Sequence, residues 1–214
     1  MRVALPLRVT LPLLGLAAVL AGCGSDNSAE PAAPTPVTVT ETVTSTETIT
    51  ETQPEVECST AGLRLTLPPQ ELPKPVADVR ERVFDAAVAC DYETLEEIAL
   101  EQGEGFTYSY GGDESAAEFW REREEAGAAE PGPKPMRALA AILAMPYTRN
   151  ESGSYAWPTA YQESPSDEDW QAIVDAGLHT QEQIDSMRAG GSGYLGYRTA
   201  ITADGDWQFF VAGD

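Results

Sequence analysis

Carboxylates are the most abundant side chains in this 214-residue chain that could do catalytic chemistry, since Asp and Glu number 35 against a single His. A glycosidase-type hydrolase needs two of them about 5–9 Å apart, one with a pKa raised by burial. The best-placed acids lie next to tryptophans: Glu118 near Trp120, Asp169 beside Trp170 and Asp206 beside Trp207. Each acid also occupies a position typical of a helix cap or a turn. An acid-pair hydrolase is therefore an alternative and not the leading hypothesis.

The single histidine, His179, lies between Leu178 and Thr180 at an expected helix start, a position typical of a surface or capping residue. No Gly-x-Ser-x-Gly turn is present, so a Ser-His-Asp triad is not indicated. One His cannot complete a zinc site, and the acidic runs at 167–169 and 204–206 do not fit the twelve-residue EF-hand loop. We expect no cofactor and no metal ion.

A cysteine thiol near the N-terminus is a candidate for covalent modification. Cys23 ends the segment Leu20-Ala21-Gly22-Cys23, which follows Arg2, Arg8 and an apolar run from 11 to 20. This layout is that of a secretory signal. The four residues resemble the lipobox of bacterial lipoproteins. The resemblance implies that residues 1–22 are a signal peptide, that Cys23 is lipidated, and that the lipid holds the protein on the extracytoplasmic face of the cell membrane.

The two remaining cysteines, Cys58 and Cys90, are an even pair in a chain expected to enter an oxidising compartment. We therefore expect them to form a disulfide. A redox or metal-binding pair is the alternative, but the Cys-x-x-Cys spacing that such pairs use is missing. On the chain-entropy account, closing a loop of about 33 residues stabilises the fold by roughly 3–4 kcal/mol.

The chain changes composition between the lipidation site and the expected domain. Prolines at 31, 34 and 36 are followed by Thr at every second position from 38 to 52, with Glu and Val between. Because this stretch has no aromatic residue and little to bury, we expect residues 23–56 to be a disordered tether that begins with the lipidated Cys. Residues 57–214 are expected to form a single extracytoplasmic domain.

The charge balance limits the partners. The formal net charge is −22 at pH 7, with 13 Lys and Arg. Nucleic acid is not expected to bind, because neutralising phosphates needs Lys and Arg. Anionic lipid head groups would also repel this surface, so the membrane is expected to be contacted through the lipid.

Periodicity predicts an α+β fold in which N-terminal helices pack on an antiparallel sheet that ends in a C-terminal β-hairpin. Helices are expected at 75–89, 136–145, 167–176 and 181–188, and further ones follow the caps Asp91 and Ser115. Strands are expected at 106–110, 154–161, 194–202 and 206–211, with Asp204-Gly205 as the hairpin turn. Pro158 predicts an edge or bulged strand.

Aromatic residues on these elements are the candidate ligand-binding residues: Trp120, Tyr155, Trp157, Tyr197 and Trp207. Strand alternation places Trp207 and Phe209 on one face and Phe210 on the other. The element order and the final hairpin resemble the nuclear-transport-factor-2-like fold, which implies a helix-covered aromatic cavity. The segment from Tyr194 to Asp214 is similar to exported bacterial domains that have no assigned activity.

These observations favour a membrane-anchored lipoprotein whose extracytoplasmic domain binds a small ligand or an envelope protein without catalysis. Two alternatives stay open. One is the acid-pair hydrolase, acting in an aromatic-lined pocket. The other is a structural spacer domain, which predicts no concave site.

Overall fold

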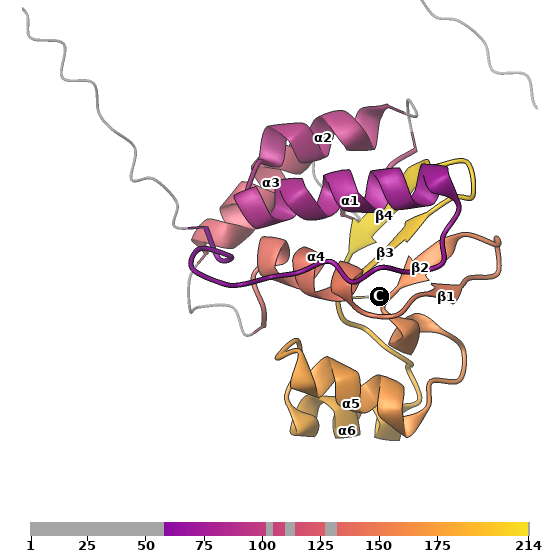
Figure 1. Ribbon diagram of the computed structural model, residues 1–214. Coiled ribbons are helices and arrows are strands. Elements are labelled where there is room, and N and C mark those ends of the chain that lie inside the picture. The colour runs from indigo at the N-terminus through magenta and orange to yellow at the C-terminus, as the bar shows by residue number, and fades with distance from the viewer. Residues whose placement is uncertain (1–57, 102–104, 110–113, 127–131, 214) are drawn as a thin grey trace, which may run out of the picture. The chain divides into compact units, whose positions relative to one another are not determined.

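A computed structural model describes residues 58–101, 105–109, 114–126 and 132–213. The expected signal peptide, Cys23 and the tether lie outside the described residues. In the described part of the chain, helices pack against a four-stranded antiparallel sheet, as predicted (Figure 1). None of its helices has both the length and the apolar character that a membrane span requires.

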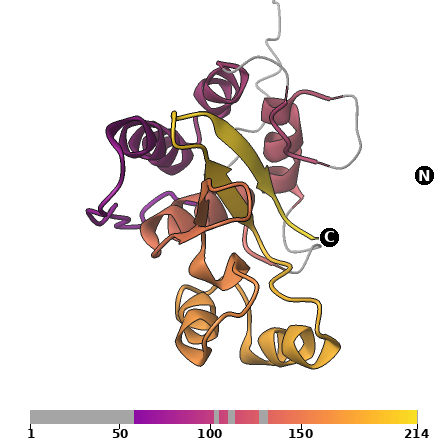
Figure 2. The same ribbon diagram turned by 90° about the vertical axis from the view of Figure 1, so that its right-hand side faces the viewer.

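Four helices precede the sheet: α1 (Lys74–Ala89), α2 (Tyr92–Leu100), α3 (Ala116–Glu125) and α4 (Pro135–Ala144). The next elements are β1 (Thr148–Arg149), β2 (Tyr155–Trp157), the 3₁₀ helix η2 (Thr159–Tyr161), α5 (Asp167–Asp175) and α6 (Gln181–Gly190). The chain ends with β3 (Arg198–Ile201) and β4 (Trp207–Val211), and the sheet order is β1-β2-β3-β4. Turned by 90°, α5 and α6 still lie together as a pair, apart from α1 and α2 (Figure 2).

Local capping determines where most of the helices begin. The side chains of Ser115, Ser166 and Thr180 each accept a hydrogen bond from the backbone N–H three residues on. The side chain at that later position in turn accepts a hydrogen bond from the backbone N–H of the cap residue. Asp91 caps α2 by accepting from the Thr94 N–H at 3.0 Å. The caps predicted from sequence at these four positions are confirmed.

Helix α4 forms the centre of the core. Its sequence is apolar apart from Arg137, and Met136, Leu139 and Ile142 are fully buried. It packs between α1 and the sheet and also contacts α3 (Figure 1). The prediction of a deeply buried helix here is confirmed, because a helix that is apolar on nearly every side can be stable only inside a core.

Strand β2 differs from its prediction. It pairs with both β1 and β3, so it is neither an edge strand nor a bulged one. It ends at Trp157, and Pro158 then serves as the N-terminal residue of η2. Because proline has no N–H for the ladder, it ends the strand here instead of occupying an edge.

The C-terminal hairpin is confirmed, but its register contains an irregularity. Trp207 pairs with Ile201 and Phe209 pairs with the residue before Ile201, so Gln208 is an extra residue in β4. The expectation that Trp207 and Phe209 share a face is therefore wrong. Trp207 and Phe210 instead both contact the Trp120 indole, with ring centroids 5.9 and 6.0 Å away.

The strand predicted at 106–110 is also wrong in its described part. Only Thr107 pairs, through an isolated parallel bridge with Phe209. The Thr107 N–H donates to the Gln208 carbonyl at 3.1 Å, and the Phe210 N–H donates to the Thr107 carbonyl at 2.9 Å. Thr107 thereby pairs with backbone groups at the outer edge of β4, which would otherwise be left without a neighbouring strand.

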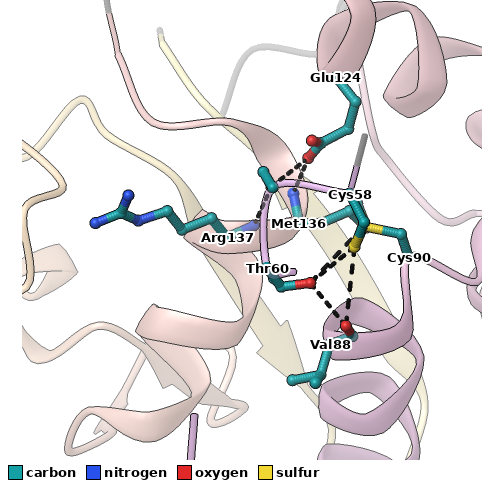
Figure 3. Close-up of a disulfide and its surroundings, with 8 residues drawn as sticks. Cys58, Thr60, Val88, Cys90, Glu124, Met136 and Arg137 are labelled. Carbon is teal, nitrogen blue, oxygen red and sulfur yellow. Dashed lines mark hydrogen bonds between the residues drawn. A yellow bond between two sulfur atoms is a disulfide. The ribbon is translucent and has the colours of Figure 1, made fainter. Parts of the chain in front are cut away.

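The predicted disulfide joins Cys58 to Cys90, with Cα atoms 5.8 Å apart (Figure 3). Cys90 ends α1 in the left-handed conformation, at φ 51°. Beside it, the Thr60 hydroxyl donates to the Val88 carbonyl at 2.7 Å. The start of the domain is thus linked to the last turn of α1 by a covalent bond and a hydrogen bond.

A buried carboxylate joins the same region to α3 and α4. Glu124 is 5 % exposed, and its Oε1 accepts from the Ser59 hydroxyl at 3.0 Å and from the Met136 N–H at 2.7 Å (Figure 3). Because Met136 lies in the first turn of α4, Glu124 supplies an N-terminal cap from another helix.

Candidate ligand-binding groove

Four of the five candidate aromatic residues are core residues. Trp120, Trp157 and Trp207 are at most 1 % exposed, and Tyr155 is 8 % exposed. Tyr197 is half-buried. Large aromatic rings lower the free energy of folding most when they are fully buried, so the sequence pattern that suggested binding residues chiefly marks the core.

The candidates separate into two clusters. Tyr155 and Trp157 surround Tyr147, with ring centroids 5.2 and 6.0 Å from its ring. Trp120 and Trp207 belong to a second cluster that includes Phe210, on which Tyr197 stacks with ring centroids 5.1 Å apart. Only the second cluster borders a groove.

This groove consists of two adjoining cavities of about 210 and 300 Å³, which share Arg123, Tyr197 and Ala212. The larger cavity is aromatic, lined by Tyr108, Phe119, Trp120, Tyr197 and Phe210. The smaller one is lined by the 132–135 segment, His179 and the 195–197 segment. The groove therefore runs from α3 across the start of β3 and the end of β4.

Sequence reasoning missed Tyr108 and Phe119, although both were placed on expected elements. Their rings lie 5.3 Å apart, and the Tyr108 ring lies 6.4 Å from that of Trp120. The Tyr108 hydroxyl donates to the Glu114 carbonyl. Phe119 and Trp120 are neighbours in α3, but no local signal places Tyr108 against them.

Two cations border the groove. The Arg123 guanidinium lies 5.0 Å above the Phe119 ring, a favourable cation–π geometry. Lys134 donates to the Glu124 carbonyl at 2.7 Å, in the last turn of α3. No Asp or Glu among the described residues lines either cavity. Among the described residues, Arg123 and Lys134 are therefore the basic side chains that line the groove of a chain whose net charge is −22.

His179 is half-buried at the groove rather than a surface or capping residue. Burial lowers its pKa, and the nearby Gln183 side chain opposes the shift, so the imidazole is neutral at pH 7. Its ring meets that of Tyr194 edge-on, 5.9 Å between centroids. The His179 Nδ1 and the Tyr194 hydroxyl are buried without a hydrogen-bond partner.

The three acids that adjoin tryptophans have structural roles. Glu118 and Asp169 complete the capping boxes of α3 and α5, and Asp206 bonds to Thr202 across the hairpin turn. None of the three lines the groove. Their interpretation as cap and turn residues is confirmed.

Carboxylates do gather around a separate cavity of about 370 Å³, lined among others by Asp78, Glu101, Asp204 and Asp206. Arg82 lines it too and hydrogen-bonds Glu101, which lowers the pKa of that carboxyl. A general acid requires the opposite shift. Within the part of the chain that the structure describes, no group of three or more His, Cys, Asp or Glu residues could hold a metal ion.

Comparison with known proteins found no match: no family model, no curated protein and no solved structure matches the chain. The resemblances to lipoproteins and to the nuclear-transport-factor-2-like fold therefore stay predictions. The groove must be interpreted from its own chemistry.

Proposed function

We propose that this protein is a lipoprotein that presents a ligand-binding domain outside the cytoplasm. Lipidation at Cys23 would hold the chain on the membrane, and residues 23–56 would be a flexible tether. The domain would bind an anionic ligand with a flat apolar part in the groove defined above. Catalysis is not part of the proposal.

The observation that carries this proposal is the composition of the groove. Aromatic rings provide apolar contact area, Arg123 and Lys134 line the groove, and no Asp or Glu does so among the described residues. A spacer domain would need no concave site, and a hydrolase of the acid-pair type would need acids in its pocket. An aromatic groove lined by Arg123 and Lys134, with no acid among its described lining residues, instead suits the binding of an anion.

The anionic dye 8-anilinonaphthalene-1-sulfonate tests the groove, with the neutral N-phenyl-1-naphthylamine as its matched control. We expect saturable binding of the anion to the full chain, at least fivefold weaker in the double variant R123Q/K134Q. The affinity of the neutral dye should change less than twofold. R188Q, on exposed α6, should leave both affinities unchanged. Equal anion affinity for R123Q/K134Q and the original chain would overturn the binding proposal, provided that circular dichroism shows both folded.

The anchor is tested independently by expressing the full chain and its C23S variant in a bacterial host. The original chain should partition into the detergent phase with the membrane fraction, and C23S should not. Intact mass should show cleavage before Cys23 and the added acyl mass. An unmodified thiol at this position would contradict the anchor without affecting the groove.

A further inference from the structure

One buried arginine, Arg198, lacks the contacts that a buried charge normally makes. Arg198, in β3, is 8 % exposed. Among the described residues, its one hydrogen bond runs from Nη1 to the Gly196 carbonyl at 3.3 Å, and no carboxylate pairs with it. Burying a charge is costly unless it is paired and hydrogen-bonded. Arg198 therefore has unused capacity for an anion.

Arg80 shows how this fold satisfies a buried guanidinium when the role is structural. It is 4 % exposed, and its three nitrogens make four hydrogen bonds, to the carbonyls of Pro68 and Leu143. A guanidinium has five N–H donors in a planar fork. Arg198 is nearly as buried as Arg80 but uses only one of those donors.

Arg198 lines a small pocket. This pocket has a volume of about 150 Å³ and is lined by Thr107, Tyr161, Arg198, Phe209 and Val211. The nitrogens of Arg198 are not among the fully buried unpaired side-chain atoms of the described residues. Nε and Nη2 are therefore not sealed from solvent.

The sheet and η2 shape this pocket. Arg198 pairs with Val211 in the β3–β4 ladder, and Phe209 lies two residues before Val211, so the three side chains share one face of the sheet. The Tyr161 ring, from η2, closes the pocket: it meets Phe209 edge-on at 6.1 Å, and the Arg198 guanidinium lies 5.4 Å above it. The result is a cation between aromatic walls.

The pocket is separate from the groove. The groove borders the opposite face of the sheet, where Phe210 and Tyr197 stack, and only Val211 lines both sites. Among the described residues, Arg198 is the single charged residue of the pocket lining, and no acid lies there.

We propose that the Arg198 pocket binds a small organic carboxylate. The planar fork of a guanidinium matches the two oxygens of a carboxylate, and a short apolar body would lie between the Tyr161 and Phe209 rings. The volume excludes large ligands. A single cation suits a monoanion better than a phosphate dianion.

Nuclear magnetic resonance of the ¹⁵N-labelled full chain tests this site with benzoate and its neutral isostere benzamide. We expect benzoate to shift the Arg198 Nε–H resonance and the backbone amide resonances of Thr107 and Phe209 saturably, and benzamide to leave them unshifted. The two amides report the affinity in variants that lack Arg198. R198K keeps the charge but loses the fork, so benzoate affinity should fall at least tenfold while the fold persists. R198Q should abolish binding; if it fails to fold, R198K alone decides.

Two control variants separate this site from other cations. R149Q removes an exposed arginine that lies 4.0 Å above the Tyr155 ring and lines a different cavity, in which Glu151 and Glu163 also lie, so it should leave benzoate affinity unchanged. R123Q/K134Q should leave the benzoate affinity reported by the Thr107 and Phe209 amides unchanged even where it weakens binding in the groove, which distinguishes this pocket from the groove. Equal affinities for benzoate and benzamide, or full benzoate affinity in R198K, would overturn the proposal and show that Arg198 serves only to pack η2 on the sheet.

Discussion

The Arg80 guanidinium donates two hydrogen bonds to the Leu143 carbonyl, from Nε at 3.0 Å and from Nη2 at 2.7 Å. Leu143 lies in the last turn of α4, where carbonyls lack partners within the helix and carry a partial negative charge. Arg80 also binds the Pro68 carbonyl and lies 5.9 Å above the Trp157 ring. A buried cation without an acid thus connects α1, α4 and the segment before α1.

Replacing Arg80 with Met should destabilise the fold by about 3 kcal/mol, because the buried Leu143 carbonyl and the partly buried Pro68 carbonyl lose charged donors while the volume is roughly kept. Denaturant unfolding followed by circular dichroism measures the loss. R82A provides a control on the same helix, because Arg82 is exposed and pairs with Glu101 on the surface. Its cost should stay within about 1 kcal/mol. Equal costs for the two variants would show that the carbonyl contacts of Arg80 contribute no special stability.

The Cys58–Cys90 disulfide should contribute about 2–5 kcal/mol, since it closes a loop with a sequence separation of 32 in a single domain. The double variant C58S/C90S should melt at a lower temperature than the original chain. Reductant should lower the melting temperature of the original chain toward that of the variant. Reductant should leave C58S/C90S unchanged, and C23S should melt like the original chain. Two free thiols in non-reducing peptide maps would refute the bridge.

Local signals explain the parts of the fold that sequence reasoning predicted. The capping boxes at Ser115, Ser166 and Thr180 need only residues three positions apart, so the sequence contains the whole interaction. The hairpin turn at 204–205 is equally local. The disulfide followed from counting cysteines.

Long-range contacts explain what was missed. Whether Trp207 shares a face of the sheet with Phe209 or with Phe210 depends on a bulge opposite Ile201. No residue type near this position predicts the bulge. Tyr108 joins the groove because Thr107 bridges to β4, about a hundred residues later in the chain. The aromatic candidates were chosen because such rings can bind ligands, but large rings also fill a hydrophobic core. Residue type alone does not separate these two roles.

His179 predicts how stability depends on pH. Burial lowers its folded-state pKa below the ordinary value of 6.5, so the unfolded chain takes up the proton first as pH falls. The stability that the neutral imidazole contributes is complete above pH 6.5 and is lost as pH falls through the folded-state pKa. Unfolding of the original chain at pH 7, 6 and 5 should show this decline, and H179Q should show a flatter profile over that range. Parallel profiles would contradict the shift.

Gly196 predicts a steric constraint at the groove. A Cβ at this position would lie 2.3 Å from the Tyr194 hydroxyl oxygen and 2.5 Å from His179 Nε2, closer than atoms can approach without movement. Since both rings are packed in place, G196A should destabilise the fold by about 1–3 kcal/mol. It should also weaken binding of the anionic dye, because the 195–197 segment lines the smaller cavity.

Gly190 provides the matched control for this substitution. It ends α6, and a Cβ there would lie 3.9 Å from its nearest neighbour, Ser192 Oγ, which is ordinary contact. G190A should be neutral or stabilising by up to about 1 kcal/mol, because alanine favours a helix more than glycine does. The difference between the two variants, measured by denaturant unfolding, isolates the crowding at Gly196. If G196A is as stable as G190A, the Tyr194 and His179 rings move freely and do not form a rigid wall of the groove.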